Sequence, residues 1–592
     1  MDGIKQMSIS LSFKKESREK TMPTQTTRIL TAHFFRRFFD NDTLSANGDT
    51  QTSVLRALII TAVPGLMTAF WLQTHYPHRS LWGIAADRYF FVLYAFVAMG
   101  AITAFEWDML FPDRADFLIL LPLPLKSREL FYAKGRALLT FLGLFLVASN
   151  LFALILYPGL STTRDEYYVH TVAVHAIAVF TAGIFAAFSM LAIKGLSIAL
   201  LPDNILRWFS PLLQCFAMAG LVLLMLLFPL VGGHLQSLLE GSPSLARCFP
   251  PLWFLGLYEH LNNPAAASPA SASLAAIALI AIAVAFLVAL ALYPLAWSRQ
   301  KKRALEGASS VRRSSRHFFS NLLHRTLLRH PEQRAVFQFL SQTITRNTHY
   351  QAYIATYAGV GLAMAFTCIL TFHTTHNPAR PLADTLTIAL DTTGLHALLP
   401  LLLFWLVAGL KTAFAFPVDM LARWVFPINL PPTSPMALPA AKSAKTWVRL
   451  GCAAITAVVL ALLLAIHWSW WGLAIQTTWG AGLTLLLPDL FFLGRTHIPF
   501  TSPRLPGRTN LPLTLVTYTA FFPLLVLSTV QAELHTESHG ATFLWTSITM
   551  ITAYLILRAI GTLTQRGILG GFPDDETEDG SQTLGLLPST QS

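Results

Sequence analysis

The sequence predicts an all-α polytopic membrane protein with about twelve transmembrane helices arranged as two six-helix modules. Of its 592 residues, 54% are hydrophobic and only 12% are charged, which is about half the charged fraction of an ordinary soluble domain. Apolar runs of about 20 residues, the length that crosses the hydrocarbon core of a bilayer, recur along most of the chain. These runs leave no extramembrane stretch long enough for a separate catalytic domain.

Each expected span is an apolar run bounded by charged residues, Pro or Gly, and each is close to the length that a bilayer requires. The first module is expected to contain spans at Val54–Gln73, Arg88–Trp107, Arg136–Tyr157, Val169–Lys194, Phe209–Val231 and Leu274–Trp297. The second is expected to contain spans at Gln351–Phe372, Leu395–Phe416, Trp447–His467, Trp470–Leu493, Pro512–Gln531 and Phe543–Leu563.

The positions of the basic residues predict the orientation of these spans. With the N-terminus in the cytosol, 34 of the 42 Lys and Arg residues fall in cytosolic segments and only five fall in outer loops. Cytosolic loops of membrane proteins carry this excess of Lys and Arg, and a wrong number of spans would destroy the alternation. The N- and C-termini are therefore both expected to be cytosolic.

Composition divides the chain into six expected parts. They are a disordered N-terminal tail (1–28), an amphipathic interfacial segment (29–53), the first module (54–297), a basic cytosolic linker with amphipathic helices (298–350), the second module (351–563) and a disordered C-terminal tail (564–592). The linker could bind nucleic acid in isolation, but beside a span its charges are better suited to anionic lipid headgroups.

Short patterns recur in the same order in both modules and indicate an old duplication with parallel repeats. The three patterns are Phe-x-x-Asp-Met-Leu, Leu-Pro and Ala-Lys. In the first module they begin at Phe105, Leu121 and Ala133, and in the second module they begin at Phe416, Leu430 and Ala441.

The segment Ile29–Phe39 is basic and aromatic, which is typical of a helix lying in the membrane interface. Helical spacing places Leu30, Phe34, Phe35 and Phe38 on one face and Arg28 and Arg36 off it. Simple membrane anchoring and a role in coupling both remain open for this segment.

The loop Asp108–Arg136 is the most informative cytosolic stretch. Pro122 and Pro124 exclude a continuous helix through it. Ser127 is placed to cap a new short helix, with Glu129 in its first turn, before the third span begins. A short helix at the cytosolic face would allow a soluble ATP-hydrolysing protein to bind and move the membrane helices. The alternative is that this segment is a re-entrant turn that binds no partner.

At this loop the chain resembles the membrane permeases of ABC exporters and uncharacterised bacterial proteins assigned to that class. The resemblance is carried by Leu121-Pro122-Leu123-Pro124, Lys126-Ser127-Arg128-Glu129 and Ala133-Lys134, and it covers the first module better than the second. In that family this loop carries the coupling helix that docks on the ATPase subunit. The resemblance implies docking candidates in both modules: Asp108, Arg114, Lys126, Arg128, Glu129 and Lys134 in the first, and Asp419, Arg423 and Lys442 in the second.

The outer loop Gly232–Ser273 is too apolar to be a free loop, and it is similar to the short re-entrant helices that close the outer end of such exporters. Irregular backbone at that depth must be buried in protein. The residues that the resemblance implies for an outer gate are Pro250, Pro251, Trp253, Phe254 and Tyr258. The second module departs from the family here, because its loop Ala532–Thr542 is too short for such helices.

The resemblance implies the permease component of an ATP-driven exporter of the bacterial cytoplasmic (inner) membrane, which moves a hydrophobic or amphipathic substrate. No GxxxxGK[ST] motif occurs, so ATP is expected on a separate ABC-type ATPase subunit. On this chain we expect no catalytic residue, cofactor or metal site. The expected partners are that ATPase and membrane lipid, not nucleic acid. The cargo, the direction of transport and the oligomeric state remain open.

Two other functions remain open. An ion-coupled secondary transporter usually needs ionisable groups inside the membrane. The spans hold few, and Glu106, Lys194, Lys411 and Asp489 all fall near expected cytosolic span ends. A non-transporting scaffold or assembly factor is the second alternative. A metal site at His373, His376 and Asp384 is disfavoured, since two loop histidines at this spacing are more often incidental.

Overall fold

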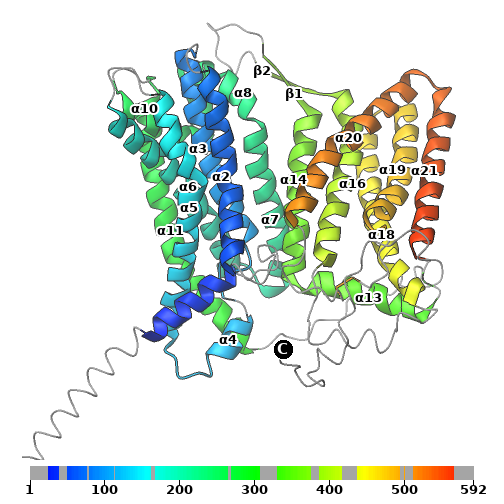
Figure 1. The fold of residues 1–592 in the computed structure, drawn as a ribbon, viewed down its shortest axis with the longest axis horizontal. Coiled ribbons are helices and arrows are strands. Elements are labelled where there is room, and N and C mark those ends of the chain that lie inside the picture. The colour runs from blue at the N-terminus through cyan, green and yellow to red at the C-terminus, as the bar shows by residue number, and fades with distance from the viewer. Residues whose placement is uncertain are drawn as a thin grey trace, which may run out of the picture. The chain divides into compact units, whose positions relative to one another are not determined.

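The computed structural model of the chain describes residues 25–38, 50–75, 79–112, 114–161, 167–264, 268–306, 328, 330–374, 386–415, 437–493, 499–500 and 511–565. Within these ranges the chain is almost entirely helical (Figure 1). Such a chain satisfies its backbone hydrogen bonds inside each segment, which an apolar environment requires. Most of the N-terminal tail and most of the C-terminal tail that were expected to be disordered lie outside the described residues; residues 25–28 and 564–565 are helical.

Nine helices among the described residues are long and apolar enough to cross a membrane, which is the architecture of a multi-pass membrane protein. Each coincides with one of the expected spans. The other three expected spans also fall on helices: α2 (Thr50–His75), α19 (Trp470–Phe491) and α20 (Leu511–Ser538). The apolar part of α2, Leu58–Thr74, is shorter than the others. The total of twelve spans remains a prediction.

Contacts divide the chain into two compact units. The first comprises Met1–Leu206 and Val231–Val311, and the second comprises Arg207–Leu230 and Arg312–Ser592. This division crosses the expected modules at α7 (Asp203–Leu226), the fifth expected span, most of which belongs to the second unit.

The first unit contains a helix at residues 25–38 and ten further elements. These are α2, α3 (Leu81–Phe105), α4 (Arg114–Leu120), α5 (Ser127–Ser161), α6 (Tyr168–Leu200), part of α8 (Phe228–Gly233), the π-helix η2 (Ser237–Gly241), α9 (Pro243–Ala246), α10 (Pro250–Asn262) and α11 (Ser271–Glu306). Helix α6 packs against α3, α5, α10 and α11. Its buried Ala178, Ala182, Gly183 and Ala186 allow this close approach, because small residues let helix backbones come together. Short α4 and α10 lie at opposite ends of the long helices (Figure 1).

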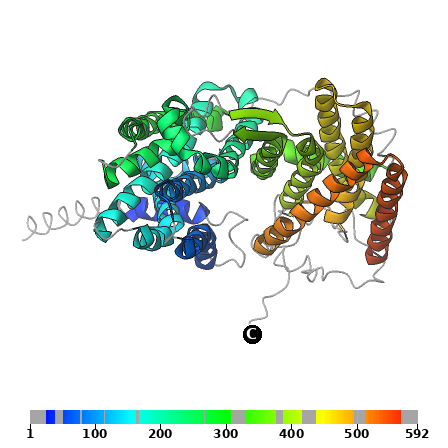
Figure 2. The same ribbon diagram turned by 90° about the horizontal axis from the view of Figure 1, so that it is seen from above.

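The second unit contains the larger part of α7 and nine further elements. These are α13 (Pro331–Arg346), α14 (Thr348–Ile369), β1 (Leu370–Thr374), β2 (Leu386–Leu390), α16 (Thr392–Ala415), α18 (Ala437–Ala465), α19, α20 and α21 (Thr542–Gln565). Helix α16 is its centre and contacts α14, α18, α19 and α20. In the view from above, α20 crosses its neighbours obliquely (Figure 2).

A two-stranded antiparallel hairpin follows α14, where the sequence predicted only a loop. Leu370 of β1 pairs with Leu390 of β2, and Thr374 pairs with Leu386. Both strands contain β-branched or aromatic residues, Thr and Phe in β1 and Thr and Ile in β2, and these residue types favour extended backbone.

The loop between the second and third expected spans differs in detail from its prediction. The helix expected at Ser127 does begin there, with Glu129 in its first turn, but it is not short: α5 runs without interruption to Ser161. No proline lies between Ser127 and Pro158, so nothing ends the helix before the apolar span. The separate short helix is α4, which precedes Pro122.

We expect Gly359→Ala to weaken the packing of α7 on α14. A Cβ at position 359 would lie 2.6 Å from the Cys215 carbonyl oxygen and 2.8 Å from Met218 Cβ, so the helices must separate. Overpacking of this kind lowers the free energy of unfolding by about 1–3 kcal/mol. The matched control is Gly220→Ala on α7, which meets nothing within 4 Å and should be neutral or stabilising. Denaturant titration in mixed micelles compares them, and equal stability of the two variants would contradict this packing.

Candidate functional site

The docking candidates of the first module differ in how far they are exposed. Asp108 forms an ion pair with Lys194 of α6 at 3.8 Å, and Lys134 on α5 is only 1% exposed. Lys126 and Arg128 are exposed, and Glu129 is half-buried. Arg114 begins α4, and nothing is described of its side chain. A soluble partner can therefore reach Lys126 and Arg128 but not Lys134.

Lys134 is covered by the helix at residues 25–38. Its Nζ lies 5.0 Å from the ring centre of Phe34 and 4.9 Å from that of Phe38, a cation–π arrangement. Phe38 also stacks on Phe141 of α5 at 4.6 Å, and Arg37 forms an ion pair with Asp116 of α4. Of the apolar face expected from the sequence, Leu30, Phe34 and Phe38 are buried and Phe35 is half-buried, and Phe38 packs on α5. A place for this helix in the membrane interface remains a prediction.

Beside Lys126 and Arg128, the chain exposes apolar side chains. Leu118 and Ile119 of α4 and Leu123 of the turn are about half exposed or more. We refer to these five residues as the docking patch. The part of the patch on α4 is held in place by the contacts of α4 with the helix at 25–38 and with α11.

The second module gives a less complete picture of its docking candidates. Lys442 lies in the first part of α18 and is exposed. Asp419 and Arg423 lie outside the described residues.

The candidate gate residues lie on α10, where Pro250 and Pro251 occupy the first helical positions. Phe254 and Tyr258 are fully buried, and Trp253 donates from Nε1 to the Arg247 carbonyl at 2.9 Å. The segment is thus a packed helix, as the sequence indicated from its apolar character. Whether it acts as a gate remains a prediction.

Charged residues surround the C-terminal part of α10. The Arg88 guanidinium lies 5.0 Å from the Tyr258 ring centre. Burial raises the pKa of the Glu259 carboxyl above its ordinary value, whereas Arg88 and a hydrogen bond with Ser268 act in the opposite direction.

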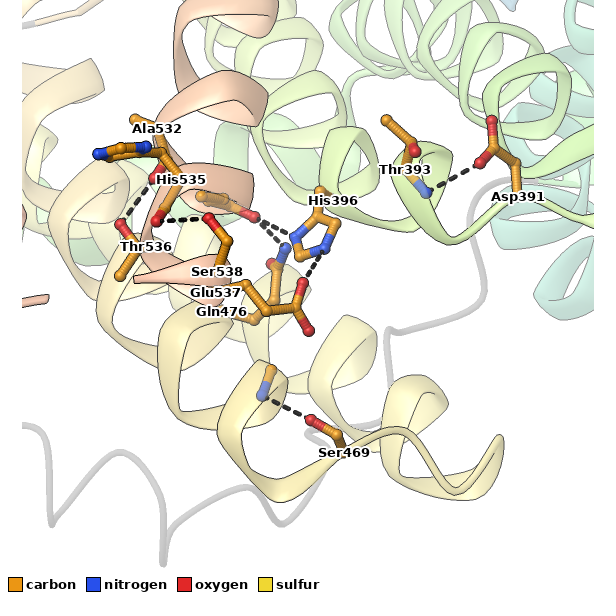
Figure 3. Close-up of polar contacts among 12 residues, drawn as sticks. Asp391, Thr393, His396, Ser469, Gln476, Ala532, His535, Thr536, Glu537 and Ser538 are labelled. Carbon is orange, nitrogen blue, oxygen red and sulfur yellow. Dashed lines mark hydrogen bonds and ion pairs between the residues drawn. The ribbon is translucent and has the colours of Figure 1, made fainter. Parts of the chain in front are cut away.

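The second unit contains a buried polar cluster that the sequence did not reveal (Figure 3). His396 of α16 places Nδ1 2.9 Å from Glu533 Oε2 and Nε2 3.0 Å from Glu537 Oε2, both on α20. Gln476 of α19 donates from Nε2 to Glu533 Oε2 at 2.6 Å. His396, Gln476 and Glu533 are at most 1% exposed, whereas the Glu537 side chain is 32% exposed. We call these four residues the His396 cluster.

The two contacts of the His396 ring set the smallest number of protons that this cluster holds. Each contact between the His396 ring and a carboxylate needs one proton, because an ionised carboxylate only accepts. Two protons among one imidazole and two carboxyls give a net charge of −1, wherever the protons reside. Buried charge of this kind is stable only when it is paired and hydrogen-bonded.

Sequence reasoning missed the cluster for two reasons. It ended the eleventh span at Gln531, whereas α20 continues to Ser538 and carries Glu533 and Glu537 on one face. Nothing in the local sequence around His396 singled it out, because its partners lie on other helices. The available signal was the four-residue spacing of the two glutamates, which places them side by side on a helix.

No metal centre is found in the parts of the chain that the structure describes. Of the disfavoured trio, His373 lies on β1, while His376 and Asp384 lie outside the described residues.

Comparison with known proteins gives no match: no family model, curated protein or solved structure is similar to this chain.

We expect His396→Leu to lower the free energy of unfolding by about 3–5 kcal/mol, because it leaves Glu533 buried without its charge partner. Adding Glu533→Gln should restore part of that loss, since the remaining polar group is then neutral. Denaturant titration in mixed micelles measures both variants.

The matched control is His535→Leu, at an exposed position on the same helix α20. It should change stability by no more than about 0.5 kcal/mol. If the stability losses of His396→Leu and Glu533→Gln simply add in the double variant, the imidazole and the carboxyl do not interact.

Proposed function

We propose that the chain is the permease component of an ATP-driven exporter of the bacterial cytoplasmic membrane. ATP is bound and hydrolysed by a separate subunit, and the substrate is hydrophobic or amphipathic. The observation that carries this proposal is the docking patch on α4 and the turn before α5, which a soluble subunit could reach.

The arrangement of the patch supports a mechanical role. Helix α5 extends unbroken from Ser127, beside the patch, through an apolar span. A displacement at Arg128 would thus be transmitted along one rigid helix. Packing of Phe38 on Phe141 and of Lys134 beneath Phe34 ties the interfacial helix to the same body. These contacts favour the coupling role of the segment over simple anchoring.

Charge indicates the kind of partner surface. Lys126 and Arg128 are both cationic, so the ATPase should present acidic residues around an apolar groove. Such complementarity between charged rims controls which partner is accepted and how fast it binds.

Ion-coupled secondary transport is a second candidate, and one observation favours it. The sequence suggested that the spans hold few ionisable groups away from the cytosolic ends, but His396 is buried at the opposite end of α16 from Lys411, and Glu533 of α20 is buried in contact with it. Buried ionisable groups in a membrane protein are candidates for ion or proton binding.

We expect Lys126→Glu combined with Arg128→Glu to reduce co-purification of an ATPase subunit at least tenfold. Reversing two rim charges turns attraction into repulsion without disturbing buried contacts, because both side chains are exposed. The measurement is a pull-down of the tagged full-length chain in mild detergent, with the ATP-binding partner quantified by mass spectrometry.

Two controls make this result specific. Arg247→Glu reverses an exposed charge in an expected outer loop and should leave co-purification unchanged. Lys134→Glu is unsuitable as a docking test, because Lys134 is buried and its reversal would disturb the fold. An ATPase that binds the double variant as well as the unchanged chain would refute the docking patch; no co-purifying ATPase at all would favour the second candidate.

A further inference from the structure

Two oxygen atoms in the His396 cluster lack a hydrogen-bond partner among the described residues. They are Oε1 of Glu533 and Oε1 of Gln476, and both are buried. A buried acceptor without a donor is costly, because it has lost its hydration and gained nothing in return. Both oxygens belong to groups that already contact each other through Gln476 Nε2 and Glu533 Oε2.

The chemistry of the orphaned atoms specifies what they would bind. Both are acceptors, and the cluster that contains them has a net charge of −1, so the ligand must supply a positive charge and a donor. A proton on Glu533 Oε1 meets both requirements. The protonated Glu533 carboxyl can donate a hydrogen bond. The Gln476 amide oxygen can accept it, and the same amide group already donates to Glu533 from Nε2.

We propose that Glu533, Gln476 and His396 form a buried proton-binding site in the second unit, with Glu537 as its connection to the surrounding medium. Uptake of one proton makes the cluster neutral while the contact between His396 Nδ1 and Glu533 Oε2 is retained. The site does not depend on ATPase docking and is compatible with either transport function.

Glu537 is the only partly exposed member of the cluster. Its carboxyl contacts His396 Nε2 at 3.0 Å, and the other ring nitrogen contacts Glu533. A proton can therefore pass from Glu537 through the imidazole, which accepts at one nitrogen as it releases at the other, to Oε2 of Glu533. Rotation of the neutral carboxyl group then turns its O–H toward Gln476.

The neighbouring elements bring few other titratable groups to this end. Just before α16, Asp391 accepts from the Thr393 N–H. His467 follows α18 and is exposed, and His535 of α20 and His539, which follows that helix, are exposed with their ring centres 4.8 Å apart. Cys368 of α14 lies beside Asp391. Among the described residues, α19 and α21 bring no charged side chain to this end.

Infrared difference spectroscopy of the purified full-length chain tests the proposal, with spectra recorded as the pH is lowered. We expect the C=O band of a protonated, buried carboxyl to appear in the unchanged chain and to be lost entirely in Glu533→Gln, which has nearly the same shape. Glu240→Gln removes an exposed glutamate elsewhere and should leave the band unchanged. Persistence of the band in Glu533→Gln would overturn the assignment.

A second variant shows whether loss of the band in Glu533→Gln reflects the missing carboxyl or a misfolded chain. Glu533→Asp keeps an ionisable carboxyl and should retain the band with a shifted midpoint, whereas loss of the band in a folded Asp variant would contradict the site. Glu537→Gln should retain the band but slow its response to D₂O severalfold; an unchanged rate would remove the connecting role of Glu537.

Sodium is the competing ligand for a pair of buried acceptor oxygens. At fixed pH, replacing choline chloride with sodium chloride should leave the band unchanged. If sodium abolishes the band at low concentration, the site binds a metal cation and the proton assignment is wrong.

Discussion

The whole architecture depends on the need of every buried backbone amide for a hydrogen-bond partner. In a chain this apolar, helices meet that need within each segment, and they leave only the helix ends for polar chemistry. The charged residues of the second unit follow this rule. Asp489 accepts from Lys445 and Arg449 at one end of α19, while His396 and Glu533 meet near the other end of the same bundle.

The two ends of this bundle have inverse charge patterns. At one end a single carboxylate is held between two cations, and at the other a single imidazole is held between two carboxyls. The first group is therefore net positive and the second is net negative. The positive group lies at the end expected to face the cytosol, as the distribution of Lys and Arg along the sequence also requires.

Composition and periodicity were sufficient to predict the nine long apolar helices found among the described residues, because each span must be apolar over a length set by the bilayer. The same reasoning predicted the buried face of Leu30, Phe34 and Phe38. It could not predict which helices meet, because lipid-facing and protein-facing residues are equally apolar. For that reason the sequence assigned α7 to the first six-helix module, whereas the structure shows it packed on α14 of the second unit. The His396 cluster escaped for a related reason: its members come from three helices, and no local spacing links His396 to Glu533.

The helix at residues 25–38 has a consequence for how the chain is made. Proteins emerge from the ribosome N-terminus first, so this helix is complete before its partner Phe141 exists. In the meantime α2 and α3 must be synthesised, and the face that carries Phe34 and Phe38 has no protein to cover it. The nearest apolar medium is the bilayer surface, where basic and aromatic helices bind. The helix would then serve the nascent chain as a temporary membrane anchor, and it would leave the lipid for Lys134 once α5 has been inserted.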